Sequence, residues 1–189
     1  MIEIKNIFKS FGKSEVLNDI SAKFERGKTN LIIGQSGSGK TVLLKCLLGL
    51  YSIDQGELIY DSIYSSKMND EEKVNIKKDM GMVFQGSALF DSLTVLENVR
   101  FPLDMLTKYS EKKKNEIALK FIERVNLNDA INKLPSEISG GMQKRVGIAR
   151  AIVLNPKYLF CDEPNSGLDP KTAIVIDNLI QEITKEYNI

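Results

Sequence analysis

The sequence predicts an α/β fold in which a parallel sheet is interrupted by a helical insertion. Three observations predict it. The first is the succession of an apolar run, a glycine-rich loop and an apolar helix over residues 29–50. The second is a pair of short apolar runs at residues 80–84 and 157–162, and the third is the helical periodicity between these two runs. Short apolar runs that alternate with helices are typical of parallel strands, since such strands are buried on both faces. We expect residues 1–85 and 156–189 to form the α/β core and residues 86–155 a helical subdomain.

The first part of the chain predicts several strands. Ile2, Ile4 and Ile7 alternate with polar residues and predict a first strand, and Phe24 lies in a second that ends at the turn over residues 26–28. Residues 29–33 predict a short buried strand, and residues 41–50 an apolar helix. After a turn at 54–56, residues 57–60 predict another strand. The dense charges of residues 67–79 predict an exposed helix.

The second part predicts two strands among helices. Residues 80–84 predict a buried strand that ends at Gln85, and residues 157–162 a second one. Between them, residues 110–125 carry apolar residues four apart, which predicts an amphipathic helix. Ser139 is a predicted N-cap, and Asp169 followed by Pro170 predicts the start of the last helix. The helix that follows Ser139 has an apolar face made of Met142, Val146, Ala149 and Val153. The apolar face of the last helix is made of Ala173, Ile176, Ile180, Ile183 and Tyr187.

Composition excludes several classes of function. The formal charge of +1 argues against a nucleic-acid-binding protein, which would carry a basic face. The chain contains no histidine, which excludes histidine-based catalysis and most zinc sites. Cys46 and Cys161 both lie in apolar runs and are expected to be buried, reduced thiols. No apolar stretch approaches the roughly 20 residues that span a bilayer, so we expect a membrane role to require partner subunits.

A glycine-rich loop with the pattern G-x-x-x-x-G-K-[ST] predicts a nucleotide phosphate site. Its glycines let consecutive backbone N–H groups turn towards one anion at the start of a helix. The lysine adds a charge for the β- and γ-phosphates, and the following hydroxyl can reach Mg²⁺. The predicted ATP-binding residues of this loop are Gly34, Gln35, Ser36, Gly37, Ser38, Gly39, Lys40 and Thr41.

Two adjacent carboxylates, Asp162 and Glu163, stand at the carboxyl end of the strand predicted at residues 157–162. Ligands bind at the carboxyl ends of strands in open parallel sheets, so Asp162 is a predicted Mg²⁺ ligand, together with Thr41. Glu163 is predicted to point elsewhere and to polarise the water that attacks the γ-phosphate. Gln85 ends a strand that is predicted to lie beside the strand at residues 29–33, and its amide oxygen is predicted to complete the Mg²⁺ shell.

The segment Ser139-Gly140-Gly141 opens a helix and therefore offers a hydroxyl, free amides and a positive dipole end to an anion. A simple cap would need no pair of glycines. Since the first glycine-rich loop already serves its own phosphates, we expect this second site to bind the nucleotide of another subunit. The sequence therefore predicts a dimer with composite sites.

These motifs together resemble an ATP-binding cassette (ABC) transporter ATPase over essentially the whole chain. GQSGSGKT resembles the Walker A motif, YLFCDE the Walker B motif, Phe84-Gln85 the Q-loop, ISGGMQKRVGIARAI the signature, and SGLD the D-loop with Asp169. Phe11 stands where the family has the aromatic ring that stacks on adenine. The resemblance implies a P-loop NTPase fold with an antiparallel β subdomain. It also implies Mg²⁺-dependent ATP hydrolysis with Lys40, Gln85 and Glu163 in catalytic roles.

The resemblance further implies partners and a location. ATP would lie between Walker A of one copy and the signature of a second copy. The dimer would sit on the cytoplasmic face of a membrane through permease subunits, and no nucleic acid would be bound. The switch histidine of the family is missing, and Met142 replaces a glutamine. We therefore expect the last strand and the His loop to be absent and the chain to be C-terminally truncated.

The run GMVFQGSALFDSLTVLENVRFPL, the SGGM signature and DEPNSGLDP resemble the ATPase of Mla/MCE-type phospholipid transport systems. Their partners include an MCE-domain lipid-binding protein. Another importer or exporter ATPase, for amino acids or lipoproteins, is the main alternative. A non-transport ABC ATPase is less compatible, because chromosome-maintenance members carry a very long coiled coil between Walker A and the signature.

Overall fold

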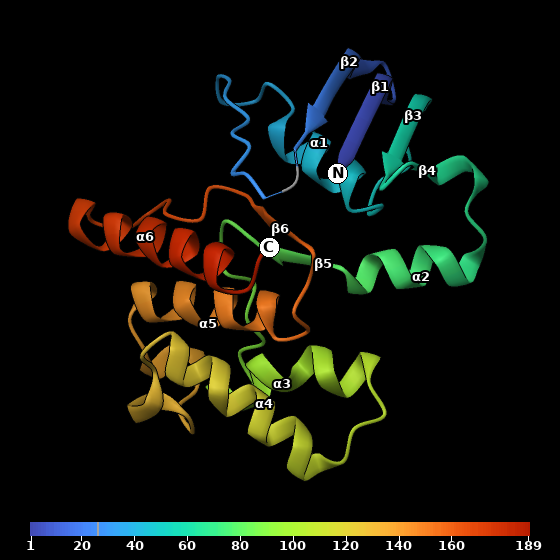
Figure 1. Cartoon of the computed structure of the whole chain (residues 1–189). Helices are drawn as coiled ribbons and strands as arrows, with labels where there is room; N and C mark the ends of the chain where they lie inside the picture. Colours follow the sequence, from blue (N-terminus) through green and yellow to red (C-terminus); the bar gives the residue numbers. More distant parts are fainter. Residues whose placement is uncertain (26) are drawn as a thin grey trace. The chain divides into compact units, whose positions relative to one another are not determined.

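The computed structural model describes residues 1–25 and 27–189 (Figure 1). Arg26, which the sequence analysis places in a turn, lies outside the described residues. The chain divides into two compact units, Met1–Lys77 and Lys78–Ile189.

The first unit is built on an antiparallel sheet with strand order β2-β1-β3-β4. Its strands are β1 (Ile2–Phe11), β2 (Ser14–Phe24), β3 (Gln55–Tyr60) and β4 (Ile63–Tyr64). Ile2, Ile4 and Ile7 are buried, as the alternation predicts. The pairing of β1 with β3 shifts register between Lys5 and Phe8. The predicted antiparallel β subdomain is therefore present.

Gly56 explains where β3 begins. The sequence predicts residues 54–56 as a turn, but Gln55 and Gly56 already belong to β3. Gly56 has φ +94°, and a Cβ there would lie 2.2 Å from the carbonyl oxygen of Asn6. Only glycine allows the two strands to approach this closely, so the turn-like composition marks an irregular strand start.

Helix α1 (Lys40–Leu47) follows the glycine-rich loop and buries Leu43, Leu44, Cys46 and Leu47. It ends before the predicted residue 50, because Gly49 takes the left-handed conformation with φ 65°. There the N–H of Gly49 bonds to Cys46 O at 2.9 Å and that of Leu50 to Lys45 O at 2.8 Å. Such bonds satisfy the last carbonyls of a helix and end it.

The predicted buried strand at residues 29–33 is wrong. These residues form neither a strand nor a helix, and Leu31 and Ile33 are each 82% exposed. A strand requires a neighbouring strand for its ladder of hydrogen bonds. In the described part of the chain, no strand pairs with this segment.

Helix α2 (Asp70–Lys78) is the predicted charged helix, and it buries no residue. Its start is fixed by a reciprocal cap in which the side chains of Asn69 and Glu72 accept each other's backbone N–H, both at 2.9 Å. The short 3-10 turn η1 (Ser65–Lys67) precedes it. Local capping therefore accounts for a helix that has no buried face.

The second unit is centred on two parallel strands, β5 (Met80–Val83) and β6 (Tyr158–Cys161). Helix α5 (Gly140–Ile152) packs on β5 and also contacts α3 (Val95–Leu106) and α4 (Glu111–Arg124), so it lies between the strands and those two helices (Figure 1). Two 3-10 turns, η2 (Asn128–Ala130) and η3 (Pro135–Glu137), connect α4 to α5. The core of this unit is formed mainly by aliphatic residues of α3, α4 and α5.

Side-chain caps define the starts of three of these helices, and the sequence predicts two of them, at Ser139 and Asp169. The side chains of Ser110, Ser139 and Asp169 accept backbone N–H groups at the starts of α4, α5 and α6 (Pro170–Glu186). Ile176 and Ile183 of α6 are fully buried, as the apolar spacing predicts. Helix α3 falls inside the predicted helical subdomain, and a capping box between Thr94 and Glu97 begins it.

Buried Asn98 fixes the loop that precedes α3. Its side chain bonds to the carbonyl oxygens of Phe90, Leu93 and Thr94 at 2.9 to 3.1 Å and accepts the N–H of Phe90 at 2.9 Å. These four bonds tie the backbone of Phe90, Leu93 and Thr94 to the first turn of α3. The loop at residues 90–94 therefore has one defined conformation.

Among residues 1–25 and 27–189, no helix combines the length and the apolar character needed to cross a bilayer.

Close contact between β5 and α5 predicts a large effect of Gly81→Ala. A Cβ at Gly81 would lie 2.3 Å from the carbonyl oxygen of Ala151, which is backbone and cannot rotate away. We expect the free energy of unfolding to fall by about 1–3 kcal/mol, as for overpacked cores. Urea unfolding measures it, with Gly86→Ala as the matched control, since a Cβ at Gly86 meets no atom within 4 Å. Equal stability of the two variants would contradict the packing described.

Candidate functional site

The glycine-rich loop of the first unit folds around its own lysine. Lys40 Nζ donates to the carbonyl oxygens of Gly34 at 2.9 Å and Gln35 at 2.8 Å. The N–H of Ser38 bonds to Gln35 O at 3.2 Å and closes the turn. The lysine charge therefore lies over the loop, in the position expected for binding phosphate oxygens.

Steric limits explain three of the loop glycines. Gly37 and Gly39 have φ of 79° and 90°, which is the left-handed region that glycine adopts without strain. A Cβ on Gly34 would lie 2.7 Å from Ser38 Oγ, and one on Gly39 would lie 3.0 Å from the carbonyl oxygen of Val16. The glycines at these positions thus reflect both backbone conformation and close approach.

The start of α1 fits an anion. Its N-cap is Gly39, which offers no side-chain cap, and the first turn carries no acidic residue. The positive end of the helix dipole is therefore not neutralised by the helix itself. Residues 33–38 are exposed, so an anion can reach this end. These properties are those of a phosphate-binding helix start.

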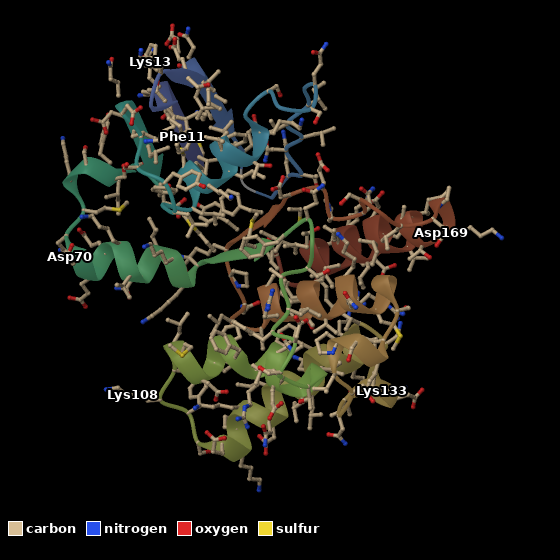
Figure 2. All side chains as sticks on the ribbon, turned by 180° about the vertical axis from the view of Figure 1, so that it is seen from behind. Phe11, Lys13, Asp70, Lys108, Lys133 and Asp169 are labelled. Carbon is tan, nitrogen blue, oxygen red and sulfur yellow. The ribbon has the colours of Figure 1, made fainter. Side chains whose placement is uncertain are left out.

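Phe11 lies at the end of β1 with 45% of its surface exposed (Figure 2). Its ring packs edge-on against Tyr51, with the centroids 5.3 Å apart, and the Lys9 ammonium lies 5.4 Å from its centroid. Phe11 pairs with Ser14 at the start of β2, and Val16 of that strand contacts the glycine-rich loop at Gly39. An exposed aromatic ring is thus held at the turn between β1 and β2 by a residue that follows α1. Sequence reasoning missed Tyr51, which supports the ring.

In the second unit, the register of the parallel strands brings Gln85 to Glu163. Met80 pairs with Tyr158 and Val83 with Cys161, and the N–H of Asp162 extends the ladder to Val83 O at 2.9 Å. The same offset of 78 residues relates Gln85 to Glu163, whose side chains bond from Nε2 to Oε2 at 2.9 Å. The two side chains predicted to be catalytic at this edge are therefore in contact.

Asp162 and Glu163 have different environments. Asp162 is only 8% exposed, whereas Glu163 is exposed and has φ 45°. A left-handed non-glycine residue is uncommon and turns the chain sharply after the strand. One carboxylate thus stays in the strand end while the next turns towards Gln85. The carboxylate and amide groups of Asp162 and Gln85 supply the oxygen ligands that Mg²⁺ prefers.

The signature turn and the Asp169 turn are neighbours in the second unit. A Cβ on Gly141 would lie 2.7 Å from Thr172 Cγ2, so the starts of α5 and α6 touch. Ser139 Oγ accepts the N–H of Met142 at 3.3 Å, and Ser139 and Gly140 are exposed. Asp169 accepts the N–H groups of Lys171 and Thr172, both at 3.1 Å (Figure 2). Hydrogen bonds from the side chain and backbone of Thr172 lower the pKa of Asp169, so this cap is ionised.

Two cations of α5 hold the loop that follows β5. Lys144 Nζ donates to the carbonyl oxygen of Gln85. Arg150 donates to Ser87 O at 2.7 Å and to Ala88 O at 2.8 Å. Burial lowers the pKa of both groups, and the Glu163 carboxylate opposes this for Lys144. Sequence reasoning missed both residues, because a basic residue in an amphipathic helix gives no signal of what it touches.

The predicted site residues fall into two groups. The first unit holds Phe11, the loop from Gly34 to Lys40, and Thr41. The second holds Gln85, Asp162, Glu163, Ser139, Gly140, Gly141 and Asp169. In the second unit, Gln85 contacts Glu163, and the signature turn lies next to the start of α6, which Asp169 caps. The predicted Mg²⁺ ligands are divided, with Thr41 in the first unit and Gln85 and Asp162 in the second.

The family described as ABC transporter matches residues 17–166, which include the motifs above apart from Phe11 and the last three residues of SGLD. The chain belongs to the ABC transporter family. It carries the ATP-binding domain of that family, and the α/β architecture with its antiparallel sheet and helices agrees with this.

Curated relatives match nearly the whole chain. A "probable ribonucleotide transport ATP-binding protein mkl" of Mycobacterium leprae is 38% identical over 99% of this chain and 54% of its own length. The "methionine import ATP-binding protein MetN" of Clostridioides difficile is 39% identical over 100% and 59%. The protein "TRIGALACTOSYLDIACYLGLYCEROL 3, chloroplastic" of Arabidopsis thaliana is 40% identical over 97% and 55%. The chain therefore spans little more than half the length of these relatives.

A solved structure has the same fold. The ATP-binding cassette MJ0796, in a dimeric post-hydrolysis state bound to ADP and Pi, matches with a TM-score of 0.87 and 33% identity. The match covers 98% of this chain and 84% of that one. The fold predicted from the sequence, that of an ABC-type cassette, is thereby confirmed.

Proposed function

We propose that this chain binds and hydrolyses ATP as the nucleotide-binding part of an ABC transporter. The observation that carries the proposal is the contact between Gln85 and Glu163 at 2.9 Å, beside buried Asp162, where β5 and β6 end. An ion ligand, a second carboxylate and an orienting amide at one strand edge suit the hydrolysis of a phosphoanhydride. A plain phosphate-binding protein would not need this arrangement.

Each group has a chemical role in this proposal. Lys40 and the amides at the start of α1 bind the phosphates, and Phe11 stacks on the adenine. Thr41, Gln85 and Asp162 would hold Mg²⁺, which neutralises charge on the β- and γ-phosphates when bound. Glu163 accepts a hydrogen bond from the attacking water and draws off its proton, while the Gln85 amide orients the carboxylate.

We further propose that the working form is a dimer. The exposed turn Ser139-Gly140-Gly141 would bind the nucleotide of the second copy, and Asp169 beside it would contact that copy. The dimeric state of MJ0796 supports this arrangement. Permease subunits would hold the dimer at the cytoplasmic face of the membrane. The division into a core of residues 1–85 and 156–189 and a helical subdomain of residues 86–155 belongs to the same proposal.

For the cargo, we propose phospholipid transport of the Mla/MCE type, with an MCE-domain protein as a further partner. The loop at residues 86–94 and the SGGM signature support it, and one relative carries the name of a galactolipid. The second candidate is amino-acid import, which the 39% identity to a methionine importer favours. As the resemblance implies, the ATPases of such systems differ from one another in the loop that Asn98 holds.

The first prediction from the proposed function concerns nucleotide binding. Lys40→Ala should weaken ATP binding by roughly a hundredfold, because a charged hydrogen-bonding group worth about 3 kcal/mol is lost. Calorimetry with ATP and Mg²⁺ measures the affinity. Lys67→Ala is the matched control, since Lys67 is an exposed lysine of the same unit that lies over Tyr64. Equal affinities for the two variants would remove the phosphate role of Lys40.

The second prediction concerns hydrolysis. Glu163→Gln should bind ATP normally but hydrolyse it about 10²- to 10⁴-fold more slowly, because an amide cannot accept the proton of the attacking water. Phosphate release by the full-length protein measures the rate, with Glu116→Gln on the exposed face of α4 as control. Turnover of Glu163→Gln at the rate of the unmodified protein would exclude Glu163 as the general base.

The third prediction concerns the cargo. The complete transporter, purified through a tag on this chain, should retain an MCE-domain subunit and phospholipid. Its ATP hydrolysis should rise with phospholipid vesicles and not with methionine or cystine. The Glu163→Gln complex is the control, because it should assemble and retain lipid without hydrolysis. Stimulation by an amino acid alone would favour the importer and contradict the lipid proposal.

A further inference from the structure

Lys144 is a buried lysine with an unusual partner. It is 5% exposed, and its ammonium donates to the main-chain carbonyl of Gln85. Within residues 1–25 and 27–189, no carboxylate forms an ion pair with it, although the Glu163 carboxylate acts on it electrostatically. Burying a charge costs free energy unless hydrogen bonds or opposite charges compensate. Its burial beside Gln85 therefore requires an explanation.

Lys114 shows what a buried structural lysine in this unit looks like. It lies on α4 with 9% exposure and pairs with Asp104 at 3.0 Å and Glu111 at 3.3 Å. Two carboxylates thus account for its charge within the helical part. Lys144 instead donates to the carbonyl oxygen of Gln85, and the negative charge of Glu163 acts on its ammonium.

The rest of the loop is already anchored without Lys144. Arg150 bonds to the carbonyls of Ser87 and Ala88, and Gly147 of α5 packs near Ser87, since a Cβ there would lie in ordinary contact with it at 3.6 Å. The N–H of Ser87 also bonds to Phe84 O at 3.0 Å. What Lys144 adds is a bond to Gln85, whose side chain donates to Glu163.

We propose that Lys144 is a positioning residue, which holds Gln85 against Glu163 and links this pair to the signature helix. Helix α5 carries Ser139 as its cap and Lys144 in its second turn. A displacement of the signature turn is therefore transmitted through one lysine to the Gln85–Glu163 pair. This inference rests on the proposed ATP hydrolysis for its kinetic consequence, and on the hydrogen bonds alone for its structural one.

The kinetic test compares Lys144→Met with Lys114→Met in the full-length protein. Lys144→Met should lower kcat for ATP by about tenfold and leave KM within about twofold, because only the positioning of the reacting groups is lost. Lys114→Met should lower the melting temperature and leave kcat within about twofold. Lys144→Arg, which keeps a donor for the carbonyl, should recover kcat to within about threefold. An equal kcat for Lys144→Met and Lys114→Met would overturn the inference.

A second measurement is independent of hydrolysis. The side-chain NH₂ resonances of Gln85, which donates to Glu163, should shift in Lys144→Met and stay unchanged in Lys114→Met. If Lys144→Met does not fold, Lys144→Gln replaces it in both measurements. A shifted resonance in a protein that hydrolyses no ATP would contradict the proposed function and support the positioning role. An unshifted resonance in a protein that hydrolyses ATP would contradict the positioning role alone.

Discussion

The parallel pairing of β5 with β6 is the constraint on which the second unit depends. Four residue pairs, and a further bond from the N–H of Asp162 to Val83 O, set the offset between the strands. This offset places Gln85 opposite Glu163. Neither residue is itself part of a strand, so their contact is a continuation of the ladder into two loops. The left-handed conformation of Glu163 then turns its carboxylate towards the amide, while Asp162 remains buried.

The arrangement at this strand edge also depends on helix α5, which packs against β5. Gly81 lets the helix approach β5 closely, and Lys144 and Arg150 fix three carbonyls of the loop that follows the strand. The same helix begins at the exposed signature turn, which touches the start of α6 at Thr172. In this unit, apolar packing, the close contact at Gly81 and the two cations of α5 therefore act together. They hold the loops at the strand edge in one arrangement.

The sequence predicted those features that depend on local rules. The caps at Ser139 and Asp169, the alternating strand β1 and the glycine-rich loop all follow from spacing and residue type. Residues 29–33 were predicted wrongly, because an apolar run shows burial preference but not whether a neighbouring strand pairs with it. Tyr51, Lys144 and Arg150 were missed, since their roles arise from contacts with residues distant in the chain.

The shared offset of 78 residues has a consequence for how this chain can vary in length. One residue inserted or deleted within β5 or β6 would slide one loop past the other by about 3.3 Å and turn every side chain beyond the change to the opposite face. The same change in the linker between α3 and α4, at residues 107–110, would leave the strand pairing untouched. Natural and engineered relatives should therefore differ in length at such linkers and keep these two strands at constant size, even where their residues change.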